Sequence, residues 1–431
     1  MIPFDQLYNF LDSVSHCNLL IYRFSPAGSK NLSDCQPLHA YYTFNSYFKQ
    51  VTTPNIIFYD QEPLFWDYYT EINQWVIDNH VCEGETGFPH WPDKLIDYVG
   101  RGNLKAVIKP VFNSIYNKVL LAHSEKRSPE LEKYENNNFI GVYFWSHALI
   151  AQDWYRYAAV DPELCYTNQF KFDFVVYGRA WSGSREYRLK FFNLLVDSGL
   201  NKYSIAKFAA EDNGQHYTTH QYVNSAFQTT NTELESNLAV NTAPSHASAT
   251  YSSLEYQQAA VDVVLETLFD DPRIQLTEKI LRPIACGKPF ILASTHGSLQ
   301  YLRDYGFKTF GDYIDESYDE VKDPGLRLQA IVRTMQEIVN HPDKQTLYNN
   351  LHKIAKFNQH RFHSREFHDM VVNEYKSNLD RALEICNQHA SGESIKLWRK
   401  IYADNDLARV WLKHHTRTYL SDYQKIFKKI K

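Results

Sequence analysis

Two carboxylates lie close together after an apolar run in the first quarter of the sequence. Asp60 and Glu62 belong to the segment DQEP at residues 60–63, which follows NIIFY at residues 55–59. Such a run predicts a buried parallel strand, and α/β domains bind ligands beyond the carboxyl ends of their strands. Because neighbouring carboxylates repel each other, the pKa of one of them is raised. A carboxylate with a raised pKa is a stronger base and suits the removal of a proton from a hydroxyl group. A solvated turn with ordinary acidic residues gives the same pattern.

A glycine- and serine-rich turn offers a place for phosphate groups. Residues 178–185 read GRAWSGSR and stand between a predicted strand and a helical pattern. We expect Ser184 to cap a helix beginning near Arg185, so that N–H groups at the helix start join Arg179 and Arg185 in holding a diphosphate. The spacing is neither a Walker loop nor a GxGxxG fingerprint, which argues against ATP hydrolysis and NAD binding. A structural turn with solvent-facing arginines is the alternative.

The segment TEKILRPIACGKPFIL at residues 277–292 has the signature of a helix followed by a strand. Thr277 is expected to cap the helix, which leaves Glu278 and Lys279 in its first turn. There Glu278 can accept hydrogen bonds from the hydroxyl groups of a ribose or a sugar, and Lys279 can pair with phosphate. Pro283 predicts a kink, and the Gly-Lys-Pro that follows predicts the end of the helix.

Two histidines follow predicted strands and are expected to face a cleft. His123 stands in HSEK and His147 in WSH, where either could contact a donor or acceptor hydroxyl. A lone histidine more often has a structural role, and no GxSxG elbow supports a serine hydrolase. The one Asp-x-Asp pair, Asp404 and Asp406, lies in a charged helical segment rather than after a strand. We therefore expect no metal site, and arginine, lysine and helix dipoles would offset phosphate charge.

The elements that must position these residues alternate between strands and helices. Apolar runs of four to six residues are separated by helical patterns, which is typical of parallel sheets in α/β folds. The predicted strands fall into two series, at residues 19–24, 55–59, 119–122 and 139–144, and at residues 172–177, 203–208, 261–265 and 289–293. Beyond them, Asp323 and Pro324 predict the N-cap and first residue of a long helix. Two such series predict two α/β domains.

The domain bounds follow from these two series. We expect an N-terminal domain at residues 1–165, a C-terminal domain at residues 166–360 and a helical extension at residues 361–431. Residues 211–256 are rich in Thr, Asn, Ser and His and lack clear periodicity. This texture predicts a long surface loop, or a lid over a cleft.

The two ends of the sequence carry opposite charge. Residues 396–431 contain ten Lys or Arg against three Asp, whereas residues 1–100 contain four basic and twelve acidic side chains. Aromatic residues are interleaved with the basic ones, so this basic segment could follow phosphates and stack on nucleic-acid bases. An amphipathic helix that closes the fold gives the same spacing. The net charge of −5 excludes a uniformly basic nucleic-acid coat but allows such a local patch.

Composition narrows the class of protein further. Hydrophobic residues make up 44% and charged residues 22% of the 431 residues, which is ordinary globular usage. The six Cys contain no CxxC pair, so a zinc ribbon or a disulfide scaffold is not expected and reduced thiols in a cytoplasm fit. We also expect no membrane span and no secretory signal peptide, because long uncharged apolar stretches and a basic N-terminal region are missing.

The segment at residues 277–292 resembles the donor-site motif of nucleotide-sugar glycosyltransferases with the GT-B fold. It is similar in particular to the Thr-Glu-Lys helix of fucosyltransferases, which a Gly-x-Pro turn and a strand follow. Four further segments resemble glycosyltransferases common in tailed phages: IIFYDQEP, LLAHSEK, VYFWSHALIAQDWYRYA and RAWSGSREYRLK. The resemblance spans residues 50–320 and implies two Rossmann-like domains that face each other across a cleft.

This resemblance implies roles for individual residues. In the fucosyltransferase type a Glu before a Pro acts as the base, and Glu62 matches it. The Glu and Lys of the helix bind the donor sugar or ribose and the diphosphate, and Glu278 and Lys279 match them. An Arg near the start of the C-terminal domain grips the diphosphate, a role that Arg179 and Arg185 both fit.

The chain departs from the family pattern before the Thr-Glu-Lys helix. Residues 271–276 lack the usual Glu-Asn strand end, and Glu266-Thr267 is its candidate counterpart.

The sequence as a whole predicts a GT-B glycosyltransferase that is inverting and metal-independent. Its donor would be a UDP or GDP sugar, with no other cofactor, and Glu62 or Asp60 would deprotonate an acceptor hydroxyl. The acceptor stays open between a 5-hydroxymethylated pyrimidine in phage DNA and a glycan. A catalytically inactive carbohydrate- or DNA-binding protein on the same scaffold is the alternative from another class. A cytoplasmic location is expected, in the host cell if a phage encodes the protein.

Overall fold

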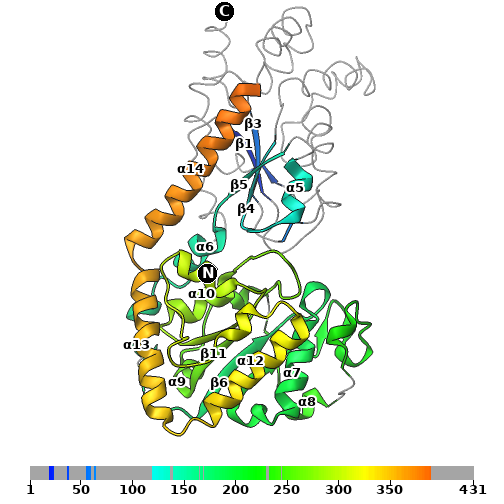
Figure 1. Cartoon of the computed structure of the whole chain (residues 1–431), viewed down its shortest axis with the longest axis vertical. Coiled ribbons are helices and arrows are strands. Elements are labelled where there is room, and N and C mark those ends of the chain that lie inside the picture. The colour runs from blue at the N-terminus through cyan, green and yellow to red at the C-terminus, as the bar shows by residue number, and fades with distance from the viewer. Residues whose placement is uncertain are drawn as a thin grey trace, which may run out of the picture. The chain divides into compact units, whose positions relative to one another are not determined.

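The computed structural model of the chain describes two five-stranded sheets, a two-stranded sheet and the helices that accompany them (Figure 1). The described residues are 19–23, 36–37, 55–59, 63–64, 119–135, 139–164, 166–167, 169–229, 233–243 and 245–389. The predicted base residues Asp60 and Glu62 lie outside this set, as does the basic segment at residues 396–431.

Contacts between residues divide the chain into two compact units. The larger unit contains residues 125–128 and 147–371. The described residues of the smaller unit are those up to 124, those in 129–146 and those from 372 onward. The chain passes between the units several times, so each unit is discontinuous in sequence. The predicted domain bounds stay a prediction.

The sheet of the smaller unit has the strand order β2-β1-β3-β4-β5. Its strands are β1 (Leu19–Arg23), β2 (Gln36–Pro37), β3 (Asn55–Tyr59), β4 (Val119–His123) and β5 (Phe139–Tyr143). The short β2 runs antiparallel to β1, and all other neighbours are parallel. Helix α5 (Pro129–Glu135) connects β4 to β5. The four strands of the first predicted series are therefore confirmed.

The sheet of the larger unit is parallel throughout and has the order β10-β7-β6-β11-β12. Its strands are β6 (Phe172–Gly178), β7 (Ser204–Phe208), β10 (Ala239–Val240), β11 (Ala259–Leu265) and β12 (Phe290–Ala293). Every residue of β11 is buried, as expected for a strand in the middle of a parallel sheet. The second predicted series is confirmed, and with it a mixed α/β fold with parallel sheets.

The strand order of this sheet reverses between β6 and β11. From β6 the chain extends across the sheet through β7 to β10, and then returns to place β11 and β12 on the other side of β6. In open α/β sheets, ligands bind beyond the carboxyl ends of the strands at such a reversal. The two carboxyl ends here are Gly178 and Leu265, so the residues that follow them form the expected binding region.

The remaining helices are named in chain order, and α14 extends from the larger unit into the smaller one. They are α6 (Ser146–Trp154), α7 (Tyr187–Asp197), α8 (Leu234–Asn237), α9 (Ser253–Gln258), α10 (Glu278–Ala285), α11 (Ser298–Asp304), α12 (Pro324–Val339), α13 (Lys344–Phe362) and α14 (Arg365–His389). Helices α9 and α10 contact β11, and α12 contacts β12 and α7. As predicted, Asp323 caps α12 by accepting a hydrogen bond from the Leu326 N–H (2.8 Å), with Pro324 as the first helical residue.

Residues 211–256 form short ordered elements, so the prediction of a long loop was wrong for the part of this segment that the structure describes. A hairpin of β8 (Glu211–Asp212) and β9 (Gln215–His216) is followed by α8, the edge strand β10 and α9. Polar side chains start several of these turns: Asn224 accepts from the Ala226 N–H and Ser252 from the Glu255 N–H. Because each element is only a few residues long, no periodicity is visible in the sequence.

Among the described residues, no helix is both long enough and apolar enough to cross a membrane.

Gly178, the last residue of β6, packs against the ring of Phe192 in α7. A Cβ atom at this position would lie 2.4 Å from Cε2 of Phe192, so alanine requires the ring or the strand to move. We predict that Gly178→Ala lowers the free energy of unfolding by about 1–3 kcal/mol, measured by urea-induced unfolding. The same substitution should cost less in a Phe192→Leu background, where the shorter side chain leaves room. Equal costs in both backgrounds would contradict the proposed clash.

Candidate functional site

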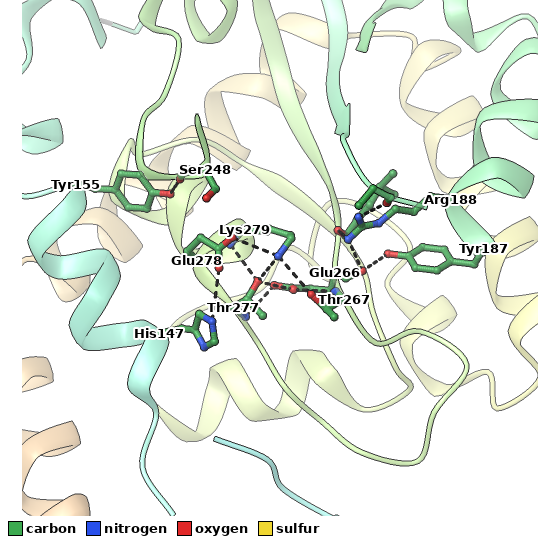
Figure 2. A network of polar contacts seen from close by, with 12 residues as sticks. His147, Tyr155, Tyr187, Arg188, Ser248, Glu266, Thr267, Thr277, Glu278 and Lys279 are labelled. Atoms are coloured by element: carbon green, nitrogen blue, oxygen red, sulfur yellow. Dashed lines mark hydrogen bonds and ion pairs between the residues drawn. The ribbon is translucent and has the colours of Figure 1, made fainter. Parts of the chain in front are cut away.

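Three segments of the larger unit meet at the reversal of the strand order. They are the turn after β6, the two residues after β11 and the start of α10 (Figure 2). The Ser184 hydroxyl donates to the Thr267 carbonyl (3.4 Å), and the Lys279 ammonium donates to the Thr267 hydroxyl (3.3 Å). Thr267 therefore links the two segments that the sequence predicted as a diphosphate site.

The start of α10 follows the prediction closely. Thr277 is the N-cap, and its hydroxyl accepts a hydrogen bond from the Lys279 N–H (3.3 Å). The helix buries Ile280, Leu281 and Ile284, while Glu278 and Lys279 occupy its first turn. Pro283 lies inside the helix, which continues to Ala285. Because the apolar face is packed into the core, the N–H groups and charges of the first turn are held at the strand ends.

The Lys279 side chain reaches back over the end of β11. Its Nζ donates to the hydroxyls of Thr277 (3.0 Å) and Thr267 (3.3 Å) and lies 3.3 Å from Oε1 of Glu278. The side chain is 29% exposed, so the ammonium is fixed by three oxygens while still open to solvent. A partly exposed ammonium is a group that can pair with phosphate.

Glu278 lies between Lys279 and His147, a residue in the first turn of α6 (Figure 2). Its Oε2 is 3.6 Å from Nε2 of His147. Burial alone would raise the pKa of Glu278, but Lys279 and then His147 outweigh that effect and lower the pKa to about 2. Burial lowers the pKa of His147 to about 4, although the Glu278 charge acts in the opposite direction. At neutral pH the pair is therefore an ionised carboxylate beside a neutral imidazole.

The turn at residues 178–185 does not cap a helix as predicted. Residues Gly183–Arg185 form one 3-10 turn, and α7 begins only at Tyr187, so the expectation that Ser184 caps a helix near Arg185 was wrong. An acidic residue from further along the chain holds the turn instead: Asp212 accepts hydrogen bonds from the N–H groups of Trp181 (2.8 Å) and Ser182 (2.7 Å). A second helix start therefore does not contribute N–H groups at this point.

The two arginines of this turn differ in exposure. Arg179 is exposed, and Arg185 is partly buried. Arg185 lies close enough to Asp212 and Tyr187 to act on their ionisation. Of the two, Arg185 therefore has the more defined surroundings.

Two residues at the start of α7 have contacts at this site that the sequence did not predict. Arg188 is buried and donates to the carbonyls of Ala180 (2.6 Å), Leu265 (2.8 Å) and Glu266 (2.8 Å). The Tyr187 hydroxyl donates to the Glu266 carbonyl (2.6 Å). They tie the turn after β6 to the end of β11. An arginine in a helical pattern gives no signal of this role, because such residues usually face solvent.

Arg282 fixes α10 one turn after Glu278. Its Nε donates to the Tyr256 hydroxyl (3.0 Å), which in turn donates to Oδ2 of the buried Asp262 (2.5 Å). The guanidinium also lies over the ring of Tyr177, 4.6 Å from its centroid. These contacts join α10 to β6 and β11 along its polar side.

The other predicted residues lie in the smaller unit or outside the described residues. His123 ends β4, is buried and packs edge-on against Tyr143. Burial lowers the pKa of His123 to about 4, so it is neutral at physiological pH. Next to the predicted base residues, Pro63 and Leu64 are described and buried. The roles of Asp60 and Glu62 stay a prediction.

Within the part of the chain that the structure describes, no group of three or more His, Cys, Asp or Glu side chains is placed to hold a metal ion.

Comparisons with known proteins identify no family for this chain. No protein-family model matches it, and neither does any curated protein. Among solved structures, the chain is similar to the crystal structure of a UDP-forming alpha,alpha-trehalose-phosphate synthase from Burkholderia xenovorans. The TM-score is 0.33 and the identity 9%, over 77% of this chain and 74% of that chain. A likeness of this degree establishes neither a shared family nor a shared activity.

The ionisation of His147 predicts a pH dependence of stability. Its pKa is about 4 in the folded protein against an ordinary value of 6.5 for histidine, so the unfolded chain binds a proton first as the pH falls. His147 therefore favours the folded state fully above pH 6.5 and progressively less down to pH 4, with a slope of up to about 1.4 kcal/mol per pH unit. We predict that His147→Gln flattens the dependence of unfolding free energy on pH in this window.

Urea-induced unfolding between pH 7 and pH 4 measures this effect. His360→Gln, at an exposed position, controls for the loss of a histidine. Parallel curves for His147→Gln and the parent protein would show that His147 is not held neutral by burial.

Proposed function

We propose that this protein is a glycosyltransferase of the GT-B type, which binds a nucleoside diphosphate sugar at the reversal of the strand order in the larger unit. One observation supports this most directly: Thr267 joins Ser184 of the turn after β6 to Lys279 of α10. A cation, hydroxyl groups and the N–H groups of a helix start thus converge at the carboxyl ends of β6 and β11. This is where open α/β sheets bind phosphorylated ligands.

The leaving group of such a reaction is a nucleoside diphosphate, whose charge has to be stabilised. We assign this role to Lys279, to Arg185 and to the positive end of the α10 dipole, with Arg179 as a further contact. Lys279 is the best supported of the three side chains, because three oxygens fix the position of its ammonium. These cations are the basis for proposing a mechanism without a metal ion.

Glu278 and His147 would contact the sugar or ribose. An ionised carboxylate accepts hydrogen bonds from hydroxyl groups, and a neutral imidazole can both donate and accept. The low pKa of Glu278 keeps it in the accepting form throughout the physiological range. The pair therefore suits a polyhydroxylated ligand beside the diphosphate.

The transfer step requires a base. We propose that Glu62, with Asp60 as its competitor, takes the proton from an acceptor hydroxyl. The oxygen then attacks the anomeric carbon while the bond from this carbon to the diphosphate oxygen breaks, which inverts the configuration. The acceptor is proposed to be either a 5-hydroxymethylated pyrimidine in DNA or a glycan. The basic segment at residues 396–431 favours DNA, because ten Lys or Arg there could contact phosphates.

Removal of either assigned cation should weaken binding of the nucleotide. Because a hydrogen bond to a charged group contributes about 1.5–3 kcal/mol, we predict that Lys279→Ala and Arg185→Ala each weaken UDP or GDP binding about 10–100-fold. Isothermal titration calorimetry measures the affinity. Lys190→Ala is the matched control, since it removes a cation from α7 that donates to the Gln228 carbonyl. Unchanged affinity in both site variants would contradict the assignment of Lys279 and Arg185 to a diphosphate site.

Glu62→Gln should leave donor binding intact and lower the rate of transfer by about 10²–10⁴-fold, because the base is lost. Asp60→Asn should have a milder effect, mainly on the pH optimum. The assay tests a panel of UDP and GDP sugars against plain DNA, hydroxymethylated DNA and glycans. A collapse of transfer in Asp60→Asn alone would move the base to Asp60. Donor binding without transfer or donor hydrolysis by the parent protein would indicate an inactive binding protein.

A further inference from the structure

Glu266, the residue directly after β11, places a carboxylate in the interior of the larger unit. Its side chain is fully buried, and both carboxylate oxygens accept hydrogen bonds. Oε1 accepts from the Thr277 N–H (3.0 Å), and Oε2 accepts from the Thr277 hydroxyl (2.7 Å) and the Thr267 N–H (3.2 Å). Thr277, the N-cap residue of α10, is therefore bound to Glu266 through both its N–H group and its hydroxyl group.

The contact with Glu266 also fixes the orientation of the Thr277 hydroxyl. A hydroxyl has one proton and two lone pairs. Because Thr277 donates its proton to Glu266, its lone pairs are left for the Lys279 N–H (3.3 Å) and the Lys279 ammonium (3.0 Å). Because the Glu266 carboxylate accepts the hydrogen bond that the Thr277 hydroxyl donates, this hydroxyl can in turn accept hydrogen bonds from Lys279.

The backbone of Glu266 is held from the opposite side. Its carbonyl accepts from the Tyr187 hydroxyl and from Arg188, both at the start of α7. In Figure 2, Glu266 lies between these two residues and the group formed by Thr277 and Lys279. One residue therefore connects the segment that follows the 178–185 turn to the start of α10.

We propose that Glu266 is a positioning residue for the diphosphate site: through Thr277 it sets the place and the hydrogen bonding of the Lys279 ammonium. This inference rests on the proposed function for its effect on the ligand. Glu266 itself is buried and would not touch the nucleotide. Its contribution is that the cation is in place before the diphosphate arrives, which lowers the cost of ordering a long side chain on binding.

Glutamine cannot replace Glu266 without loss. All three groups that face the carboxylate are donors in the present arrangement, so a glutamine amide has to turn its own N–H₂ toward one side. On the Oε1 side it would meet the Thr277 N–H. On the Oε2 side it would meet the Thr267 N–H and force the Thr277 hydroxyl to accept, which removes a lone pair from Lys279.

The test is a double-mutant cycle read by calorimetry with UDP and GDP. We expect Glu266→Gln to weaken binding about tenfold in the parent protein and to have no further effect in a Lys279→Ala background. Asp319→Asn is the matched control, because Asp319 is a buried carboxylate that accepts from the Ser298 and Leu299 N–H groups at the start of α11. It should leave the affinity unchanged. An equal loss in both backgrounds would overturn the inference.

A second measurement needs no ligand. Acetic anhydride acylates lysine amines, and a Lys279 side chain that no longer donates to the Thr277 hydroxyl is held less firmly and meets the reagent more often. We expect Lys279 to be acylated severalfold faster in Glu266→Gln than in the parent, relative to other lysines in the same sample, and not faster in Asp319→Asn. If Glu266→Gln does not fold, Thr277→Val breaks the same link and should give the same increase. An unchanged rate would overturn the inference.

The two measurements separate this inference from the proposed function. If the parent protein binds neither UDP nor GDP, the proposed function fails, and the acylation rate of Lys279 alone decides whether Glu266 positions it.

Discussion

A charged carboxylate can be buried only where hydrogen-bond donors surround it, and this requirement organises the candidate site. Glu266 follows β11 without exposure to solvent, and three donors from Thr267 and Thr277 meet its oxygens. Satisfying the carboxylate brings the start of α10 against the end of β11. The ammonium of Lys279 then lies over the same strand end. The positions of the cation and of the first helical N–H groups thus depend on one buried acid.

Buried basic side chains in the larger unit donate hydrogen bonds to backbone carbonyl groups at the ends of strands and in the segments between them. A parallel sheet leaves carbonyl groups without partners where strands end and connecting segments begin. Arg188 donates to the carbonyls of Ala180, Leu265 and Glu266, and the buried Lys288 donates to those of Tyr256 and Ala259. Arg327 does the same for Phe269, Val321 and Lys322, where its guanidinium also stacks on the Phe269 ring. These side chains fix the segments around the sheet, whereas the Lys279 side chain is partly exposed.

The protonation states around Glu278 suit the same region to hydroxyl groups as well as to phosphate. Burial keeps His147 neutral, and the Lys279 charge keeps Glu278 ionised despite its own burial. An acceptor, a neutral imidazole and an ammonium therefore lie within a few ångströms of one another. A ligand that carries a diphosphate next to a sugar offers groups complementary to all three, and this is the physical basis on which a nucleotide sugar is proposed as the donor.

The sequence by itself determined the strands of both sheets and the start of α10, because apolar runs and capping residues act locally: Thr277 and Asp323 each cap the helix that follows them. The sequence also predicted that Glu278 and Lys279 lie in the first turn of α10, as they do. The prediction that Ser184 caps a helix was wrong, because Asp212, far along the chain, holds that turn and α7 begins later. Only the tertiary structure revealed the roles of Tyr187 and Arg188 and the junction at Glu266. These roles depend on which carbonyls and donors the strand order brings together, and no spacing along the chain records that.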